Sequence, residues 1–103
     1  MNMNQKMVAK KTNAQMSVEQ ARSLIIKPYI TEKTFNMIER ENTLTFIVAE
    51  RATKNQIKEA LAMLYESQVI EVNTSRTSQG KKAHMKFKEP EGARNLATTL
   101  GLV

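Results

Sequence analysis

The apolar and polar positions along the chain follow two periods, one typical of strands and one typical of helices. Four segments with period-two alternation, or with β-branched and aromatic content, are predicted to be strands and span residues 24–27, 44–48, 69–77 and 81–88. Three segments with apolar residues three or four apart are predicted to be amphipathic helices and span residues 31–40, 53–67 and 93–100. The predicted order is therefore β-α-β-α-β-β-α.

Residues that favour the ends of helices and strands mark several boundaries. Pro28 is expected to end the first strand because proline has no backbone N–H to donate. Thr31 is predicted to be a helix N-cap, and Glu32 then lies in the first turn, where the helix dipole favours a negative charge. Residues 53–56 form a capping box of the T-x-x-Q type, and Gly101 is expected to close the last helix.

The apolar residues of each predicted element lie on one face only. In the first helix, Phe35 and Ile38 are expected to share one face. In the third strand, Ile70, Val72 and Thr74 are likewise expected to point to the same side. Such elements require helices on one side of a sheet and leave the other side in contact with water. We therefore predict an α/β (α+β) protein with an antiparallel or mixed sheet and helices packed on it.

Length and composition favour one small domain behind a polar tail. The chain has 103 residues, and residues 1–20 are polar and lack a convincing period. They are predicted to be a flexible N-terminal tail, although Val18, Ala21 and Arg22 would allow a short helical turn. Residues 21–103 are predicted to form the single domain.

The sequence lacks the signals of oxidised, secreted or membrane-spanning proteins. It has no cysteine, which excludes disulfides and thiolate metal sites. Its apolar runs are far shorter than the roughly 18 residues of a membrane helix, and its N-terminus lacks the apolar core of a secretory signal. We therefore expect a cytoplasmic protein without membrane insertion.

The charge balance points to an anionic partner. Sixteen Lys and Arg oppose ten acids, all of them Glu, which gives a formal charge of +6 and a pI of about 9.8. Such a balance favours nucleic acid or an acidic membrane surface without choosing between them.

The most basic stretch is the predicted hairpin from Arg76 to Lys88, which holds five cations and no acid. Lys82, Lys86 and Lys88 are expected to project from one face of the last strand, with side chains two residues apart separated by about 6.6–6.8 Å. Such a row suits a phosphate backbone. A solvated sheet face that resists aggregation would have the same pattern, so the pattern alone leaves both interpretations open.

No constellation with catalytic or metal-binding chemistry is visible. His84 is the only histidine and has no second ligand or orienting partner in the pattern. The glycines are isolated, so no phosphate-cradling loop exists. The helix starts at 31–33 and 53–54 suit phosphate oxygens, but plain capping explains them as well. We predict no catalytic residue, no metal and no cofactor; the rival is a small enzyme that uses His84 or Arg76.

Four short segments together resemble the universal large-subunit ribosomal protein L23 family. Residues 27–33 (KPYITEK), 52–58 (ATKNQIK), 69–74 (VIEVNT) and 81–87 (KKAHMKF) are similar to four motifs of that family. Those motifs are (R/K)-P-x-(V/I)-(S/T)-E-K, A-T-K-x-(E/D/Q)-I-K, V-x-x-V-N-T and K-K-A-Y-V-K-L. They occur in the family's order, and the resemblance covers about residues 24–103.

The resemblance implies a fold, a location and partners. It implies a four-stranded antiparallel sheet and binding to large-subunit ribosomal RNA at the rim of the polypeptide exit tunnel, within the cytoplasmic ribosome. It also implies a docking platform for the signal recognition particle, for chaperones of the nascent chain and for the protein-conducting channel. The neighbouring ribosomal protein would be L29.

The resemblance also implies site residues. Glu32 matches an exposed acid on which factor docking relies. The residues that fall in RNA-facing segments or in the basic hairpin are Lys27, Lys33, Lys54, Asn73, Thr74, Arg76, Lys81, Lys82 and Lys86.

Two departures from the family pattern limit what is carried over. His84 stands where the family usually has an aromatic residue. The turn at 78–80 is very short, which is typical of archaeal members of the family. A role in lining the tunnel, which belongs to members with a long hairpin, is therefore not expected for this chain. The alternative function is a free-standing module for single-stranded RNA, which would need aromatic residues on the open sheet face. The basic strand offers only lysines and His84 there.

Overall fold

The structure is a computed structural model that describes residues 16–102. The helices are α1 (Val18–Leu24), α2 (Glu32–Glu41), α3 (Lys54–Tyr65) and α4 (Gly92–Thr99). The strands are β2 (Ile25–Pro28), β3 (Thr43–Val48), β4 (Val69–Thr77) and β5 (Gly80–Phe87). The predicted order is confirmed, with α1 added before the first strand.

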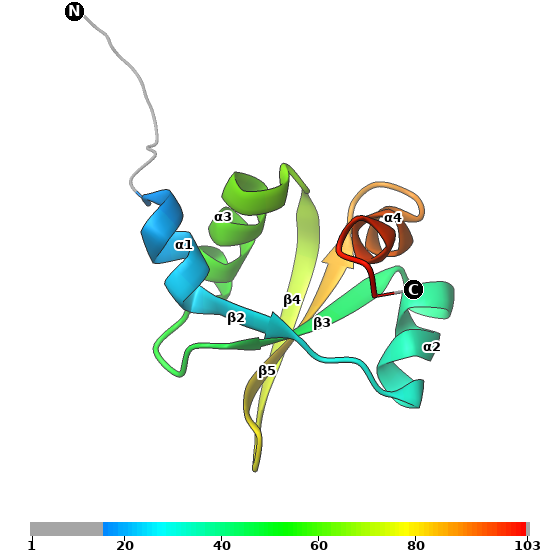
Figure 1. Cartoon of the computed structure of the whole chain (residues 1–103), viewed down its shortest axis with the longest axis horizontal. Coiled ribbons are helices and arrows are strands. Elements are labelled where there is room, and N and C mark those ends of the chain that lie inside the picture. Colours follow the sequence, from blue (N-terminus) through cyan, green and yellow to red (C-terminus); the bar gives the residue numbers. More distant parts are fainter. Residues whose placement is uncertain (1–15, 103) are drawn as a thin grey trace, which may run out of the picture.

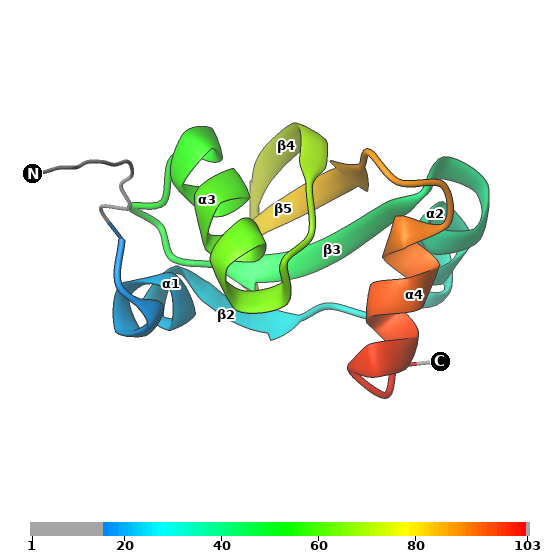
Figure 2. The ribbon, with the colours of Figure 1, turned by 90° about the horizontal axis from the view of Figure 1, so that it is seen from above.

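The four strands form one antiparallel sheet in the order β2-β3-β5-β4. Helices α1, α3 and α4 lie on one side of it and α2 packs at one end, which leaves the opposite side without a covering helix among the described residues (Figures 1 and 2). We call this opposite side the open face. The predicted fold class, an antiparallel sheet with helices packed on it, is confirmed.

The core lies between the sheet and the three helices. Leu44, Phe46 and Val48 of β3 point into it and are almost fully buried, as are Ile57 and Leu61 of α3. Burial of such side chains is worth roughly 1.5–3 kcal/mol each. All six residues of β3, which pairs with β2 on one edge and with β5 on the other, are buried.

The predicted caps are confirmed. The N–H of Thr34 donates to Oγ1 of Thr31 over 3.2 Å, and the N–H of Gln56 donates to Oγ1 of Thr53 over 3.2 Å. Gly101 has a φ of 77°, and the N–H of the residue after it donates to the carbonyl of Ala97 over 2.8 Å. This is the left-handed helix ending that glycine favours.

Two predicted core positions are wrong. The helix α2 buries Thr34 and Ile38, while Phe35 is 39% exposed. The pairing of β4 with β5 shifts by one residue after Val69, and this bulge turns Ile70 outward to 53% exposure. A bulge inserts one unpaired residue and breaks strict alternation, so a period-two pattern cannot locate it.

Asn42 has a long-range structural role. It ends α2 in the left-handed conformation, with a φ of 54°. Its amide donates to the carbonyls of Phe87 and Glu89, over 3.1 and 2.8 Å, and its Oδ1 accepts from the N–H of Ala93 over 2.9 Å. Asn42 therefore caps the first turn of α4, whose own N-cap residue makes no side-chain hydrogen bond.

The described part of the chain begins with a capped helix. Ser17 and Gln20 form a reciprocal capping box for α1, and Met16 is buried against the core. The helix α1 thus starts at Val18, within the range 1–20 assigned to the tail. Residues 1–15, the rest of that range, lie outside the described residues.

Candidate nucleic-acid interface

Strand pairing arranges the side chains of the open face in rows that cross the sheet. In β5, Ala83 and Met85 are fully buried in the core, so the residues that alternate with them point to the open face. Paired residues of neighbouring strands share a face. The first row therefore runs across the four strands as Lys27, Ile47, Lys82 and Ser75.

The second row contains the only aromatic side chain that the described residues place on this face. It runs as Tyr29, Thr45, His84 and Asn73. The N–H of Tyr29 donates to the carbonyl of Thr45 over 3.0 Å. The Nζ of Lys82 lies 3.8 Å from the centre of the Tyr29 ring, a cation–π contact.

The third row contains Thr43, Lys86 and Glu71. Lys33, at the start of α2, borders the face near His84, whose pKa it lowers. The open face thus presents Lys27, Lys33, Lys82 and Lys86, and none of these four is in an ion pair among the described residues. A surface with four free cations suits a polyanion.

Two cations of the basic hairpin belong to the opposite side of the sheet. Lys81 pairs with Val48, a core residue, and its Nζ donates to the carbonyls of Ala52 and Glu50 over 2.7 and 3.4 Å. Arg76 forms an ion pair with Glu50. Both cations therefore hold the loop after β3, and the structure separates them from Lys82 and Lys86.

Two further predicted site residues also lie away from the open face. Thr74 pairs with the buried Ala83 and faces the helix-covered side. Lys54 is the first residue of α3, which lies on that same side (Figure 1). The nine predicted RNA-facing residues are thus divided: five, Asn73 among them, line or border the open face, and four do not.

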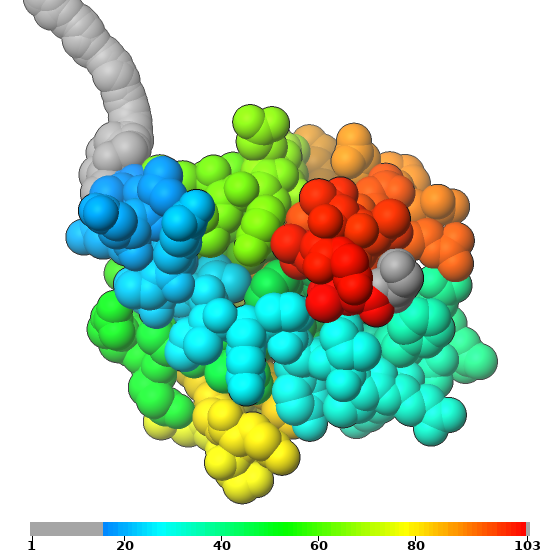
Figure 3. Space-filling model, viewed as in Figure 1, coloured from blue at the N-terminus to red at the C-terminus, as the bar shows by residue number. Residues whose placement is uncertain are grey.

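Figure 3 shows the tip of the β4–β5 hairpin, drawn in yellow, projecting from the body of the protein.

His84 is held as a neutral imidazole at the centre of the open face. Its Nδ1 lies 2.8 Å from Oγ1 of Thr45, a residue that is fully buried. Burial lowers the pKa of His84 below 6.5, the positive charges of Lys33 and Lys82 lower it further, and Glu41 offsets part of this shift. The imidazole therefore adds no formal charge to the face at neutral pH.

The lowered pKa of His84 has a consequence for stability. Around and just below pH 6.5 the unfolded chain binds more protons at His84 than the folded chain, so stability rises with pH in that window. We expect acidification from about pH 7.5 to about pH 5.5 to lower the free energy of unfolding, and His84→Asn to reduce this dependence. Urea denaturation at both pH values measures the effect.

Because the chain has one histidine, an NMR titration of its imidazole gives the folded pKa without assignment ambiguity. A midpoint at or above 6.5 would contradict the lowered pKa. Glu39→Gln, which changes an acid outside the open face, serves as a control that should leave the histidine titration unchanged.

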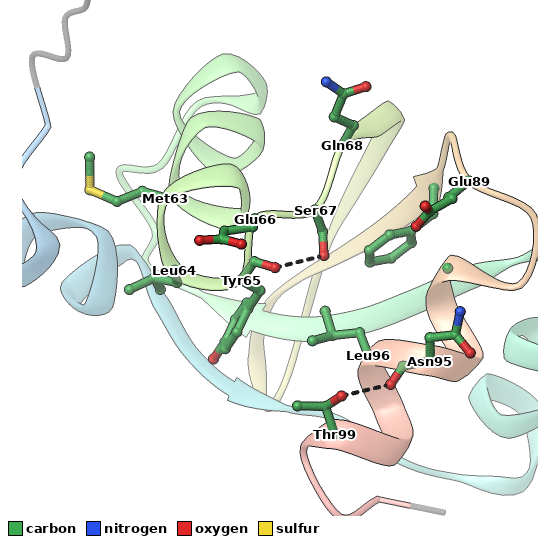
Figure 4. A pocket seen from close by; sticks show the side chains of 12 residues that line it. Met63, Leu64, Tyr65, Glu66, Ser67, Gln68, Glu89, Asn95, Leu96 and Thr99 are labelled. Atoms are coloured by element: carbon green, nitrogen blue, oxygen red, sulfur yellow. Dashed lines mark hydrogen bonds between the residues drawn. The ribbon is translucent and has the colours of Figure 1, made fainter.

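A hollow of about 460 Å³ lies on the helix-covered side, between the end of α3 and α4 (Figure 4). Two of its hydroxyls are bonded locally: Ser67 donates to the carbonyl of Tyr65 over 3.2 Å and Thr99 to that of Asn95 over 3.0 Å. Neither His84 nor Arg76 lines it. This hollow therefore does not contain the two residues that the rival enzyme would need.

Glu32 lies in an exposed position beside apolar side chains. It occupies the first turn of α2, and Ile30 and Phe35, the residues two before it and three after it, are each 39% exposed. Exposed apolar patches rimmed by polar residues mark protein-binding surfaces. Glu32 thus lies where the helix dipole favours a negative charge, and exposed apolar side chains lie near it in the sequence.

Sequence reasoning missed Tyr29 and Thr45. The place of Tyr29 on the open face depends on its pairing with β3, and the sequence signal that marks it is its two-residue spacing from Lys27. Thr45 stands between two core residues of β3, so alternation places it on the open face. Its complete burial there comes from neighbours on β2 and β5, which a single segment cannot reveal.

These features define a small α+β protein with one basic sheet face. The described residues contain no group of three side chains that could hold a metal ion. They also contain no helix long and apolar enough to cross a membrane.

Comparison with known proteins identifies the family. The profile of the family described as Ribosomal protein L23 matches residues 23–99, so the chain belongs to the ribosomal protein L23 family. It is 47% identical over 81 residues to the large ribosomal subunit protein uL23 of Methanobrevibacter smithii, covering 78% of this chain and 94% of that protein. It is 45% identical over 80 residues to the protein of the same name from Methanococcus vannielii, covering 77% and 93%.

The comparisons confirm several predictions. The predicted family is right, and the relatives come from methanogens, which agrees with the archaeal type that the short turn suggested. The chain is a structural constituent of the large ribosomal subunit and is not an enzyme, as predicted. In the structure, Thr77 pairs with Gly80, so only Ser78 and Gln79 lie between the two strands and the hairpin is short.

Proposed function

We propose that the protein binds large-subunit ribosomal RNA through its open face, near the polypeptide exit tunnel. The observation that carries this proposal is the set of four cations, Lys27, Lys33, Lys82 and Lys86, on the one sheet face that the described helices leave uncovered. In a ribosomal protein, the polyanion available to such a face is RNA. Membership of the ribosome also supports the cytoplasmic location.

The proposed mechanism is neutralisation of phosphates, with polar groups that fix the position of the RNA. Lysines provide contacts that do not depend on base sequence, while Asn73 and Ser75 offer hydrogen bonds in the same rows. One face of the Tyr29 ring is already covered by Lys82, so that face is closed to base stacking. This favours recognition of the RNA backbone over the alternative, a module for single-stranded RNA.

The predicted site residues on the helix-covered side of the sheet are proposed to support RNA binding indirectly. Lys81 and Arg76 hold the loop that leads to Lys54, so they fix the position of the start of α3. Lys54 and Thr74 would reach RNA only if the RNA continued around the edge of the sheet. The direct contacts are therefore assigned to the open face.

Co-sedimentation with the ribosome tests the function. We expect the native protein to sediment with large subunits at low salt and to be released only at high salt, because counterion release makes lysine–phosphate contacts salt-dependent. Washing subunits with increasing KCl and quantifying the protein in pellet and supernatant gives the measurement. A protein that never joins the large-subunit fraction would refute the proposal.

We also propose that Glu32 and the exposed apolar residues beside it are a docking surface at the tunnel exit. The proposed partners are the signal recognition particle, nascent-chain chaperones and the protein-conducting channel, with ribosomal protein L29 as the neighbour in the subunit. The support is the combination of an exposed acid with the exposed Ile30 and Phe35. All three project from one short stretch at the start of α2.

We expect Glu32→Ala to weaken binding of the signal recognition particle to assembled ribosomes while leaving assembly intact. The dipole contribution lost is only about 0.3–1 kcal/mol, so the domain should stay folded. Glu19→Ala, which removes an acid from the first turn of α1, is the matched control. If both variants bind the particle like the wild type, Glu32 acts only through the helix dipole.

A further inference from the structure

Lys82 differs from the other lysines of the open face because its ammonium group is already held in place. It lies 3.8 Å from the centre of the Tyr29 ring, and both side chains are partly buried. Tyr29 is itself fixed, since its N–H donates to the carbonyl of Thr45 over 3.0 Å and the preceding Pro28 restricts the backbone. Less side-chain entropy is therefore lost when Lys82 meets an anion.

His84, two residues further along the same strand face, presents a hydrogen-bond donor. Thr45 is fully buried, and its hydroxyl has no partner other than Nδ1 of His84 within residues 16–102. If the imidazole donated this bond, the hydroxyl hydrogen would remain buried and unpaired, which is costly. The favoured arrangement is that Thr45 donates to Nδ1, which leaves the imidazole proton on Nε2.

We propose that these four residues form a preorganised site for one phosphate group of the RNA backbone. Lys82 supplies the charge and Nε2–H of His84 supplies a hydrogen bond, while Tyr29 and Thr45 are positioning residues. The side chains of Lys82 and His84 start about 6.6–6.8 Å apart on one strand face, so a single phosphate can meet both. The proposal rests on the proposed RNA-binding function of the open face.

The Tyr29 part of the site is tested with the full-length chain and deproteinised archaeal large-subunit ribosomal RNA. We expect Tyr29→Leu to weaken binding about two- to fivefold at low salt, the range of an exposed to partly buried cation–π contact. Tyr29→Phe keeps the ring and should bind like the wild type. In a Lys82→Met background, Tyr29→Leu should have no further effect, because the ring then has no ammonium group to position.

The Thr45 part is tested in the same assay. We expect Thr45→Val to weaken binding about two- to tenfold, since it removes the hydroxyl that sets the imidazole tautomer. Thr45→Ser keeps the hydroxyl and should bind RNA like the wild type. In a His84→Ala background, Thr45→Val should change nothing more. Circular dichroism melting of every variant identifies any that fail to fold, and Phe and Ser variants provide the folded comparison in each case.

The outcomes separate this proposal from the broader one. Wild-type affinity for Tyr29→Leu and Thr45→Val, or effects that persist in the Lys82→Met and His84→Ala backgrounds, would overturn the phosphate site. Lys27→Met and Lys86→Met lie outside the site and report on the open face itself. If Lys27→Met and Lys86→Met each lower the salt slope of binding by about one while the Tyr29 and Thr45 variants have no effect, only the proposed phosphate site is refuted. If they leave the slope unchanged, the proposed function fails.

Discussion

Reversing two charges on the open face, by Lys82→Glu with Lys86→Glu, should reduce binding to ribosomal RNA on the order of a hundredfold at low salt. Each reversal replaces an attraction of about 1 kcal/mol by a repulsion of similar size, before screening by salt. The slope of log affinity against log salt should also fall by about two, one for each lost phosphate contact. Filter binding or fluorescence anisotropy over a range of KCl concentrations measures both quantities.

The matched control is Arg22→Glu with Lys58→Glu, which changes the net charge equally on the helix-covered side. Arg22 lies in the last turn of α1 and Lys58 lies in α3. A general electrostatic attraction of a protein of charge +6 would make the two double variants equally weak. If RNA binds specifically to the open face, the control variant should keep most of its affinity for RNA and most of the salt dependence of that affinity. Equal losses in both would remove the open face as the RNA-binding surface.

The largest loss of stability is expected for Asn42→Ala. The change removes three hydrogen bonds that join the end of α2 to the end of β5, to Glu89 in the next loop and to the start of α4. It also places alanine at a φ of 54°. Partly buried groups left without partners and a left-handed non-glycine residue each cost energy, so we expect a loss of about 2–4 kcal/mol in the free energy of unfolding. Urea denaturation of the full chain measures it.

Three further variants divide this loss into its causes. Asn42→Gly relieves the backbone strain and should be less destabilising than alanine. Asn42→Asp keeps the oxygen that accepts from Ala93 but removes the amide that donates to two carbonyls. Asn36→Ala changes an exposed asparagine of the same helix and should cost little. A loss below about 0.5 kcal/mol for Asn42→Ala would show that these hydrogen bonds contribute nothing net.

Local signals predicted most of the fold. Each of Thr31, Thr53 and Gly101 acts within a few residues of its own position, and each is where the sequence placed it. Non-local features were not predictable in this way. The bonds of Asn42 reach residues 45 to 51 positions away, and the outward turn of Ile70 depends on the register between two strands.

The candidate site was predicted in part for the same reason. Alternation along one strand correctly placed Lys82 and Lys86 together, because it depends only on that strand. The same alternation separates Lys81 from them, but the count of cations in the hairpin obscured it. Tyr29 was not predicted as a site residue because it follows another strand, and only the pairing of β2 and of Tyr29 itself with β3 brings it to the open face.

The burial of all six residues of β3 has a consequence for synthesis of the chain. Its partner β5 follows about 40 residues later in the chain, so β3 leaves the ribosome before this neighbour does. Until residues 80–87 emerge, the sequence TLTFIV exposes an unpaired edge and an apolar surface, both of which promote aggregation. The hairpin of β4 and β5 is local and closes rapidly once made. Folding of the sheet is therefore completed only when the C-terminal fifth of the chain is released.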